Sequence, residues 1–314
     1  MNLWLHGPSR PPRGAVPRPH QQYDEVAEAS ASLVIRAYSS SFGLASRLLG
    51  GRVRADVRNV YALVRVADEI VDAPRPEGDD TERRATLDAL EEATVTALRT
   101  GSSSNLVVHA FARTARRCGV DKALVAPFFA SMRTDLDRTE HDDASLATYV
   151  YGSAEVVGLM CLRAFLADEP QREVQYEALG PGAQRLGAAF QKVNFLRDLG
   201  EDGDDLGRRY LVGLDPADPD EAAWTRWLDD VDADLAAAAA VVPALPRSSR
   251  VAVCTAHDLF SELAVRLRRT SPVEARDRRV RVPGAVKARL AAGALLRDGL
   301  PRTATPVRHA GAAA

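Results

Sequence analysis

The sequence predicts an all-α protein, and this prediction depends on where prolines fall and how apolar residues are spaced. Prolines are absent over residues 20–73 and 128–169, and such gaps suit long helices. Apolar residues inside the helical stretches recur three and four positions apart, as in Leu186, Phe190 and Val193. Alternation with a period of two over strand lengths is hard to find. We therefore assign the chain to the all-α class.

Each predicted helix occupies a stretch with this spacing, and its ends fall at prolines or at breaks in the apolar pattern. We expect residues 1–22, rich in proline and arginine, to be a flexible leader, residues 23–299 to form one domain and residues 300–314 to be a flexible tail. The predicted helices, in order, are 24–37, 41–49, 53–73, 80–99, 104–118, 121–138, 145–167, 183–202, 219–241, 248–269 and 284–297.

Composition excludes several classes of protein. The 314 residues are 46% apolar with a net charge of −2, which is too apolar for a disordered chain and not the polycation typical of nucleic-acid binding. Three cysteines without a C-x-x-C pair disfavour a disulfide framework and a structural zinc, so we expect a cytoplasmic protein. We find no run near the roughly 20 apolar residues that a membrane span needs. Residues 266–314 are strongly basic, which favours peripheral contact with an anionic membrane, although a solvated arginine-rich surface is an equal alternative.

Two predicted helices place carboxylates beside their apolar faces. On helix 53–73, Asp68 and Asp72 are four residues apart and follow the arc of Val57 and Val60. On helix 183–202, the acidic residues continue the arc of Phe190 in the same way, and they are Asp198, Glu201 and Asp202.

Like charges four residues apart on a helix repel, so each pair needs compensation. Ion pairs with Arg65 and Arg197 on a solvated face would supply it, and for one helix alone this is the simpler interpretation. Two such helices in one chain favour a different interpretation, namely a divalent-metal site that binds a diphosphate group. Mg²⁺ takes one or two carboxylates, waters and phosphate oxygens as ligands, while arginines hold the remaining phosphate oxygens.

These residues resemble the motifs of the head-to-head isoprenoid synthases, the family of phytoene, squalene and dehydrosqualene synthases. Residues 61–72, YALVRVADEIVD, resemble the first Asp-rich motif, and residues 191–202, QKVNFLRDLGED, resemble the second. Supporting similarities are the segments 39–42, 149–152, 208–211 and 279–282, which occur in the order of the family.

The resemblance implies one isoprenoid-synthase domain, a helical bundle around a central apolar cavity that binds two prenyl diphosphates. Loss of diphosphate from one substrate would give an allylic cation, and attack by the second would give a cyclopropylcarbinyl diphosphate that ionises, rearranges and is quenched. The implied cofactor is Mg²⁺ or Mn²⁺, and no nicotinamide is expected for a phytoene synthase. A dry cavity would protect the cation from water.

Site residues follow from the same resemblance. The implied metal ligands are Asp68, Asp72, Asn194, Asp198 and Asp202. The implied diphosphate contacts are Ser39, Ser41, Tyr61, Arg65, Arg197 and Arg279. Tyr151 is the implied aid to proton removal or cation stabilisation. The implied lining of the prenyl cavity is Phe42, Ser46, Val157 and Phe190.

Departures and alternatives bear on the exact product. Ser40 is at a position where the family has a lysine, and Glu155 is at a position where members often have a glycine. Residues 257–264 contain no tyrosine, although relatives tend to have one there, and Phe260 is its expected replacement. The chain lacks the patterns usual for prenyl-chain elongases and terpene cyclases. The form of the first motif and the small Ser46 favour geranylgeranyl diphosphate as substrate. A synthase that uses C15 substrates (squalene, dehydrosqualene or presqualene diphosphate) and a catalytically silent binding protein remain the alternatives.

Overall fold

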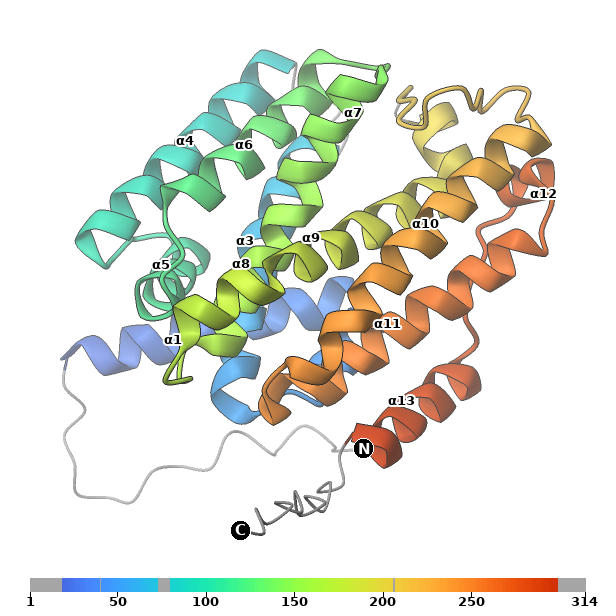
Figure 1. Cartoon of the computed structure of the whole chain (residues 1–314). Coiled ribbons are helices and arrows are strands. Elements are labelled where there is room, and N and C mark those ends of the chain that lie inside the picture. The colour runs from blue at the N-terminus through green and yellow to red at the C-terminus, as the bar shows by residue number, and fades with distance from the viewer. Residues whose placement is uncertain (1–18, 40, 73–79, 206, 299–314) are drawn as a thin grey trace, which may run out of the picture.

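The computed structural model describes residues 19–39, 41–72, 80–205 and 207–298, and this part of the chain is helical, as predicted. It contains no β-strand, only an isolated bridge between Glu140 and Arg209. The helices pack around one another in a single bundle, with α13 at its edge (Figure 1). In chain order they are α1 (Pro19–Tyr38), α2 (Ser41–Ser46), α3 (Gly51–Asp72), α4 (Asp80–Thr100), α5 (Leu106–Cys118), α6 (Lys122–Asp137), α7 (Asp143–Val150), η1 (Tyr151–Glu155), α8 (Val156–Leu166), α9 (Arg172–Arg197), η2 (Glu201–Asp205), α10 (Glu221–Val241), η3 (Val242–Ala244), α11 (Arg247–Arg268), α12 (Pro272–Asp277) and α13 (Gly284–Asp298).

Helix α9 differs most from the sequence prediction. It begins at Arg172 rather than at 183, and it runs through Pro181, because its packing against α8 and α10 outweighs the hydrogen bond that proline cannot donate. The predicted helix 183–202 is also not continuous. Helix α9 ends at Arg197, and after a turn at Asp198 the chain continues into the π-helical turn η2.

Three further boundaries differ from the prediction. The predicted helix 145–167 is divided by η1 into α7 and α8, and the short helix α12, capped by the side chain of Ser271, was not predicted. Helix α1 begins at Pro19, inside the predicted leader, since proline is well tolerated in the first turn of a helix. Residues 1–18 and the predicted tail lie outside the described residues.

Helices α8 and α9 approach each other unusually closely, and two glycines permit this. A Cβ atom on Gly158 would lie 2.5 Å from the carbonyl oxygen of Ala183 on α9. A Cβ atom on Gly187 of α9 would lie 2.5 Å from the carbonyl oxygen of Ala154 in η1, the turn that leads directly into α8. The close contact fixes α9, and with it the second acidic motif, relative to the rest of the bundle.

The apolar core has two main parts. One lies among α3, α4, α5, α6 and α8 and contains Phe111, Phe128 and Phe129. The other lies among α9, α10 and α11 and is centred on the buried Trp224. The continuous helical stretch Asp143–Leu166 is long and apolar enough to cross a membrane by composition, contrary to the sequence expectation, but half of its most apolar window is buried inside the protein.

Candidate active site

The first acidic motif occupies the second half of α3, where the helix presents a half-buried face. Val57 and Val60 are buried in the core, and Arg65, Asp68 and Asp72 lie on the adjoining face, as their spacing predicts. The side chain of Asp68 is closely surrounded by protein yet 30% exposed. This face is therefore open to a ligand while remaining fixed by the core behind it.

Three of the residues predicted to contact diphosphate meet on this face of α3. The hydroxyl groups of Ser39 and Tyr61 are joined by a hydrogen bond, which links the end of α1 to α3. The guanidinium group of Arg65 pairs with Glu69 and lies 3.8 Å from Asp68, and it packs over the ring of Tyr38 at 4.6 Å. A fixed guanidinium group beside two hydroxyl groups is well suited to hold phosphate oxygens.

The second motif gathers at the end of α9. Arg197 donates through Nε to Asp198 Oδ1 at 2.8 Å, and its Nη2 contacts the other carboxylate oxygen. Arg279, from the segment after α12, lies 3.0 Å from the same Oδ1 and donates to Glu201 Oε2 at 2.9 Å. Arg197 and Arg279, both predicted to contact diphosphate, therefore share one carboxylate. The predicted ligand Asn194 is half-buried one turn before Asp198.

Arg208 joins the two motifs. It donates through Nη1 to Asp72 Oδ1 at 2.6 Å and through Nη2 to the carbonyl oxygen of Val71 at 2.9 Å. The charge of Arg208 also acts on Asp202, and the carboxylates of Asp72 and Asp202 are near enough to repel each other. The predicted convergence of α3 and the end of α9 is therefore present in the structure.

Negative charge in this region exceeds what the arginines compensate. Burial, together with the nearby Asp72, raises the pKa of Asp68 to about 7. Burial and the nearby Asp198 raise the pKa of Asp202 to about 8. Carboxyl groups held in this way favour a bound cation, because a cation would stabilise their charged form.

The donor set fits a magnesium ion that is completed by its substrate. Among the described residues, no three His, Cys, Asp or Glu side chains already surround one position as ligands. The aspartates instead come as two pairs, Asp68 with Asp72 and Asp198 with Asp202. Mg²⁺ needs only one or two carboxylates when waters and phosphate oxygens supply the other ligands, so the pairs are adequate.

A buried network behind Arg208 was missed by the sequence analysis. Asp135 of α6 accepts hydrogen bonds from the hydroxyl groups of Tyr149 at 2.9 Å and Tyr210 at 2.8 Å. Burial raises the pKa of Asp135 to about 6, although the charge of Arg208 opposes this. The signal was present in the sequence, because Asp135 continues the apolar face of Phe128 and Met132 at helical spacing.

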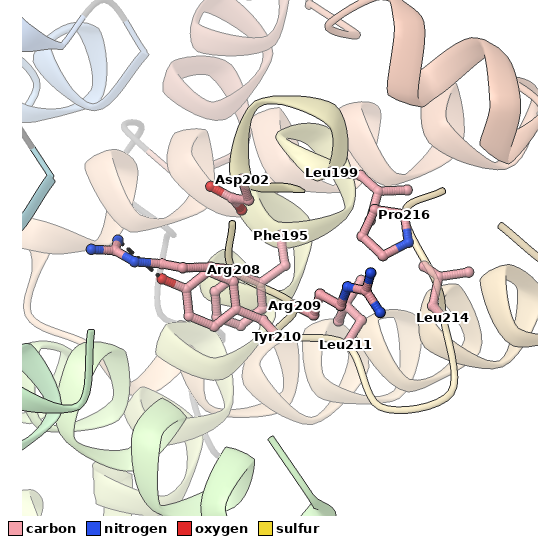
Figure 2. Close-up of a pocket in the computed structure, with 9 residues that line it drawn as sticks. All are labelled: Phe195, Leu199, Asp202, Arg208, Arg209, Tyr210, Leu211, Leu214 and Pro216. Atoms are coloured by element: carbon pink, nitrogen blue, oxygen red, sulfur yellow. Dashed lines mark hydrogen bonds between the residues drawn. The ribbon is translucent and has the colours of Figure 1, made fainter. Parts of the chain in front are cut away.

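The pocket next to this network is small and lies on the side of the second motif. Figure 2 shows Asp202 and Arg208 at one end of it, with the ring of Tyr210 stacked on Phe195. Arg208 also lies 3.4 Å from the hydroxyl oxygen of Tyr210.

The residues predicted to line a prenyl cavity do not line this pocket. Ser46 is buried and donates to the carbonyl oxygen of Gly43, Val157 packs against the first core, and Phe190 stacks on Phe260 with ring centroids 3.8 Å apart. Ser41 and Phe42 have side chains outside the described residues.

The predicted functional tyrosine, Tyr151, does not contact the aspartates among the described residues. It is 37% exposed at the start of η1, near Tyr176 of α9.

Comparison with known proteins assigns the chain to a family. The model of the squalene/phytoene synthase family matches residues 35–285. The phytoene synthase of Mycobacterium tuberculosis is 31% identical over 284 residues, covering 83% of this chain and 88% of that protein. The 15-cis-phytoene synthase of a Paracoccus species is 28% identical over 260 residues, covering 76% of this chain and 82% of that protein.

Solved structures agree on the fold. A dehydrosqualene synthase in complex with a ligand superposes with a TM-score of 0.75 at 23% identity, covering 88% of this chain and 98% of that chain. The squalene synthase HpnC of Alicyclobacillus acidocaldarius has a TM-score of 0.66 at 18% identity, covering 78% of this chain and 94% of that chain.

The fold is that of the terpenoid synthases, and paired aspartates flanked by arginines suit the binding of diphosphate groups. The chain belongs to the squalene/phytoene synthase family. This family comprises head-to-head synthases of the prenyltransferase type, which act on prenyl diphosphates with a divalent metal.

Proposed function

We propose that this protein is a phytoene synthase, which condenses two molecules of geranylgeranyl diphosphate head to head, through prephytoene diphosphate, to phytoene. The observation that carries the proposal is the link between the two acidic motifs, in which Arg208 binds Asp72 beside Asp202. The C20 substrate is favoured by the phytoene synthases among its relatives at 31% identity. Phytoene would make the enzyme part of carotenoid biosynthesis.

The side chains have distinct roles in this proposal. Asp68, Asp72, Asp198 and Asp202 would hold Mg²⁺, which when bound stabilises the negative charge of the leaving diphosphate. Ser39, Tyr61 and Arg65 would bind one diphosphate from the side of α3, and Arg197 and Arg279 would bind the other from the side of α9. Because these donors are already positioned by the fold, they stabilise developing charge with little reorganisation.

Two steps separate the substrates from the product. Cleavage of the C–O bond of one substrate releases diphosphate, and the double bond of the second attacks the allylic cation. Loss of one proton then closes the cyclopropane ring of the cyclopropylcarbinyl diphosphate. Release of the second diphosphate, rearrangement and loss of one proton give phytoene. Tyr151 is assigned to the last stage, where its ring would stabilise the cation or its hydroxyl would assist proton removal.

The alternative is a synthase that uses C15 substrates, which the likeness to the dehydrosqualene synthase structure keeps open. The purified protein is incubated with Mg²⁺ and either farnesyl or geranylgeranyl diphosphate, with and without NADPH. Phytoene from the C20 substrate without NADPH supports the proposal. C30 products alone would contradict the C20 assignment, and absence of diphosphate release from both substrates would favour a catalytically silent protein.

We further propose that the enzyme is cytoplasmic and contacts anionic membranes through its basic C-terminal part. Helix α13 carries the exposed Leu295 and Leu296 next to Arg297, a combination that suits a lipid surface. Binding to vesicles that contain phosphatidylglycerol should weaken as salt is raised. Binding that is independent of ionic strength would contradict the electrostatic part of this proposal.

A further inference from the structure

Four arginines lie near one another around α1 and α3, since the charges of Arg36, Arg47 and Arg54 all act on Arg58. We call them the arginine cluster. Arg36 is in the last turn of α1, Arg47 follows α2, and Arg54 and Arg58 lie one turn apart on α3. Neither the acidic motifs nor the diphosphate contacts described above include any of them.

The arginine cluster contains no compensating negative charge in the described part of the chain. None of its four members forms an ion pair with a described residue, although most arginines around the bundle do, such as Arg84 with Asp137. Arg54 donates to the carbonyl oxygen of Leu49 through Nε at 3.2 Å and Nη2 at 2.8 Å, which fixes its position. The Nε atom of Arg58 is buried and has no hydrogen-bond partner among the described residues.

Such an arrangement is unfavourable unless an anion occupies it. Burial and the charges of Arg54, Arg36 and Arg47 lower the pKa of Arg58. Like charges on adjacent turns of a helix destabilise it, and a buried N–H group without an acceptor carries a desolvation penalty. A ligand with several anionic oxygens would relieve both costs, because guanidinium groups match phosphate oxygens in geometry and charge.

The arginine cluster is also continuous with the candidate active site. Arg54, Arg58, Tyr61, Arg65 and Asp68 follow one another at spacings of three and four residues, so they form one stripe along α3. Arg58 and Asp68 are ten residues apart, which corresponds to about 15 Å along the helix. An anion at the arginine cluster would thus lie on the same helix face as the aspartates but beyond reach of their metal.

We propose that Arg36, Arg47, Arg54 and Arg58 form a second anion site, which binds a group of the phosphate class without a metal ion. The ligand is either free phosphate or diphosphate, or the phosphate of a lipid headgroup. This proposal does not depend on the proposed synthase activity, since the site is separate from the aspartates.

The test uses modification of arginine side chains by phenylglyoxal, followed by peptide mass spectrometry on the full-length protein. The variant Asp68→Asn with Asp72→Asn is used without divalent cation, so that the aspartates cannot contribute through a metal. Arg36 and Arg47 are exposed and should react, and Arg99, an exposed arginine on α4, serves as the reference in the same sample. Inorganic diphosphate should slow modification of Arg36 and Arg47 relative to Arg99.

Substitution identifies the residues that bind. Arg58→Gln should weaken the protection by diphosphate about tenfold or more, the effect of losing one charge-assisted contact, while Arg84→Gln should leave it unchanged. If Arg58→Gln does not fold, the exposed pair Arg36→Gln with Arg47→Gln, followed by calorimetric titration with diphosphate, gives the same comparison.

Vesicles distinguish the two sources of the phosphate group. Protection by soluble phosphate or diphosphate assigns a free ligand, and protection by phosphatidylglycerol vesicles alone assigns a lipid headgroup, with phosphatidylcholine vesicles as the control. If none of these slows the modification of Arg36 and Arg47 relative to Arg99, the proposal is wrong. Because no prenyl substrate is used, this result is independent of whether the protein makes phytoene.

Discussion

Arg208 and Asp72 are 136 residues apart in the sequence and are joined by a hydrogen bond of 2.6 Å between Nη1 and Oδ1. Arg208 is 7% exposed, whereas the side chain of Asp72 is 38% exposed. The arginine thus anchors the carboxylate from the protein interior and leaves its outer part accessible to a ligand. Since Arg208 follows the second motif and Asp72 ends the first, this pair sets how the two halves of the site face each other.

Substitution of Arg208 should impair both activity and stability. Arg208→Gln removes the charge that orients Asp72 and its bond to the carbonyl oxygen of Val71, so we expect diphosphate release to slow by about tenfold to a hundredfold. The free energy of unfolding should fall by about 2–3 kcal/mol, measured by urea denaturation. The neighbouring Arg209→Gln, which removes an exposed pair with Glu140, should change either value little. Equal effects of the two substitutions would contradict the role given to Arg208.

Asp68 and its neighbour Glu69 should differ in their effect on metal dependence. Asp68→Asn removes a proposed magnesium ligand, and we expect kcat to fall on the order of a hundredfold or more, about 3 kcal/mol of barrier, with a higher Mg²⁺ concentration needed for half-maximal rate. Glu69→Gln removes only a partner of Arg65 and should cost much less. The rate of diphosphate release over a Mg²⁺ titration measures both. A normal Mg²⁺ dependence in Asp68→Asn would remove Asp68 from the metal site.

The sequence predicted the helical class and most helices because proline gaps and apolar spacing act locally. It also predicted that Asp68, Asp72, Asp198 and Asp202 lie in one region, since the family motifs fix their relation. The prediction was wrong for α9, which begins at Arg172 and runs through Pro181 instead of beginning at 183. Contacts of α9 with α8, α10 and η1, including the close approach of Gly187 to η1, decide that helix, and such long-range contacts leave no local pattern.

Within the site, carboxylates that lack a second acidic residue on the same face of the helix were not predicted from the sequence. Asp135 forms no acidic pair, so it drew no attention, although its position on the apolar face of α6 marked it as buried. The family resemblance includes Tyr149 only as part of a motif and implies Tyr151 as the functional tyrosine. In the structure it is Tyr149, in α7, that reaches the region of Arg208 through Asp135, whereas Tyr151, at the start of the π-helical turn η1, is exposed.

The raised pKa of Asp135 predicts how stability depends on pH. Its pKa is about 6 in the folded protein, against about 3.9 in an unfolded chain. The folded state therefore binds more protons between about pH 4 and 6, so the free energy of unfolding should fall as pH rises through this window. Urea denaturation across the window should show a smaller fall for Asp135→Asn than for the unsubstituted protein. Asp68 and Asp202, whose pKa values are also raised, contribute to the fall in both proteins, so the difference between the two slopes reports Asp135.

Asp142 provides the control for this measurement. Its hydrogen bonds with Ser145 lower its pKa, so its contribution to stability is lost only as pH falls below the window. Asp142→Asn should therefore leave the slope between about pH 4 and 6 unchanged, since asparagine also caps a helix well. An unchanged slope in Asp135→Asn would show that Asp135 is ionised in the folded protein at lower pH than its burial implies.

Two glycine-to-alanine substitutions should have opposite effects on stability, one where α9 packs closely against η1 and one in α13. In Gly187→Ala the new methyl group would lie 2.5 Å from the carbonyl oxygen of Ala154, so the helices must separate, and we expect a loss of about 1–3 kcal/mol in the free energy of unfolding. In Gly293→Ala nothing lies within 4 Å, and alanine should stabilise α13 by about 0.5–1 kcal/mol because it restricts the unfolded chain. Urea denaturation measures both. Because α9 carries the second motif, Gly187→Ala should also slow diphosphate release at temperatures where it is folded, and a destabilised variant with normal rates would show that the spacing of α8 and α9 does not position Asp198 and Asp202.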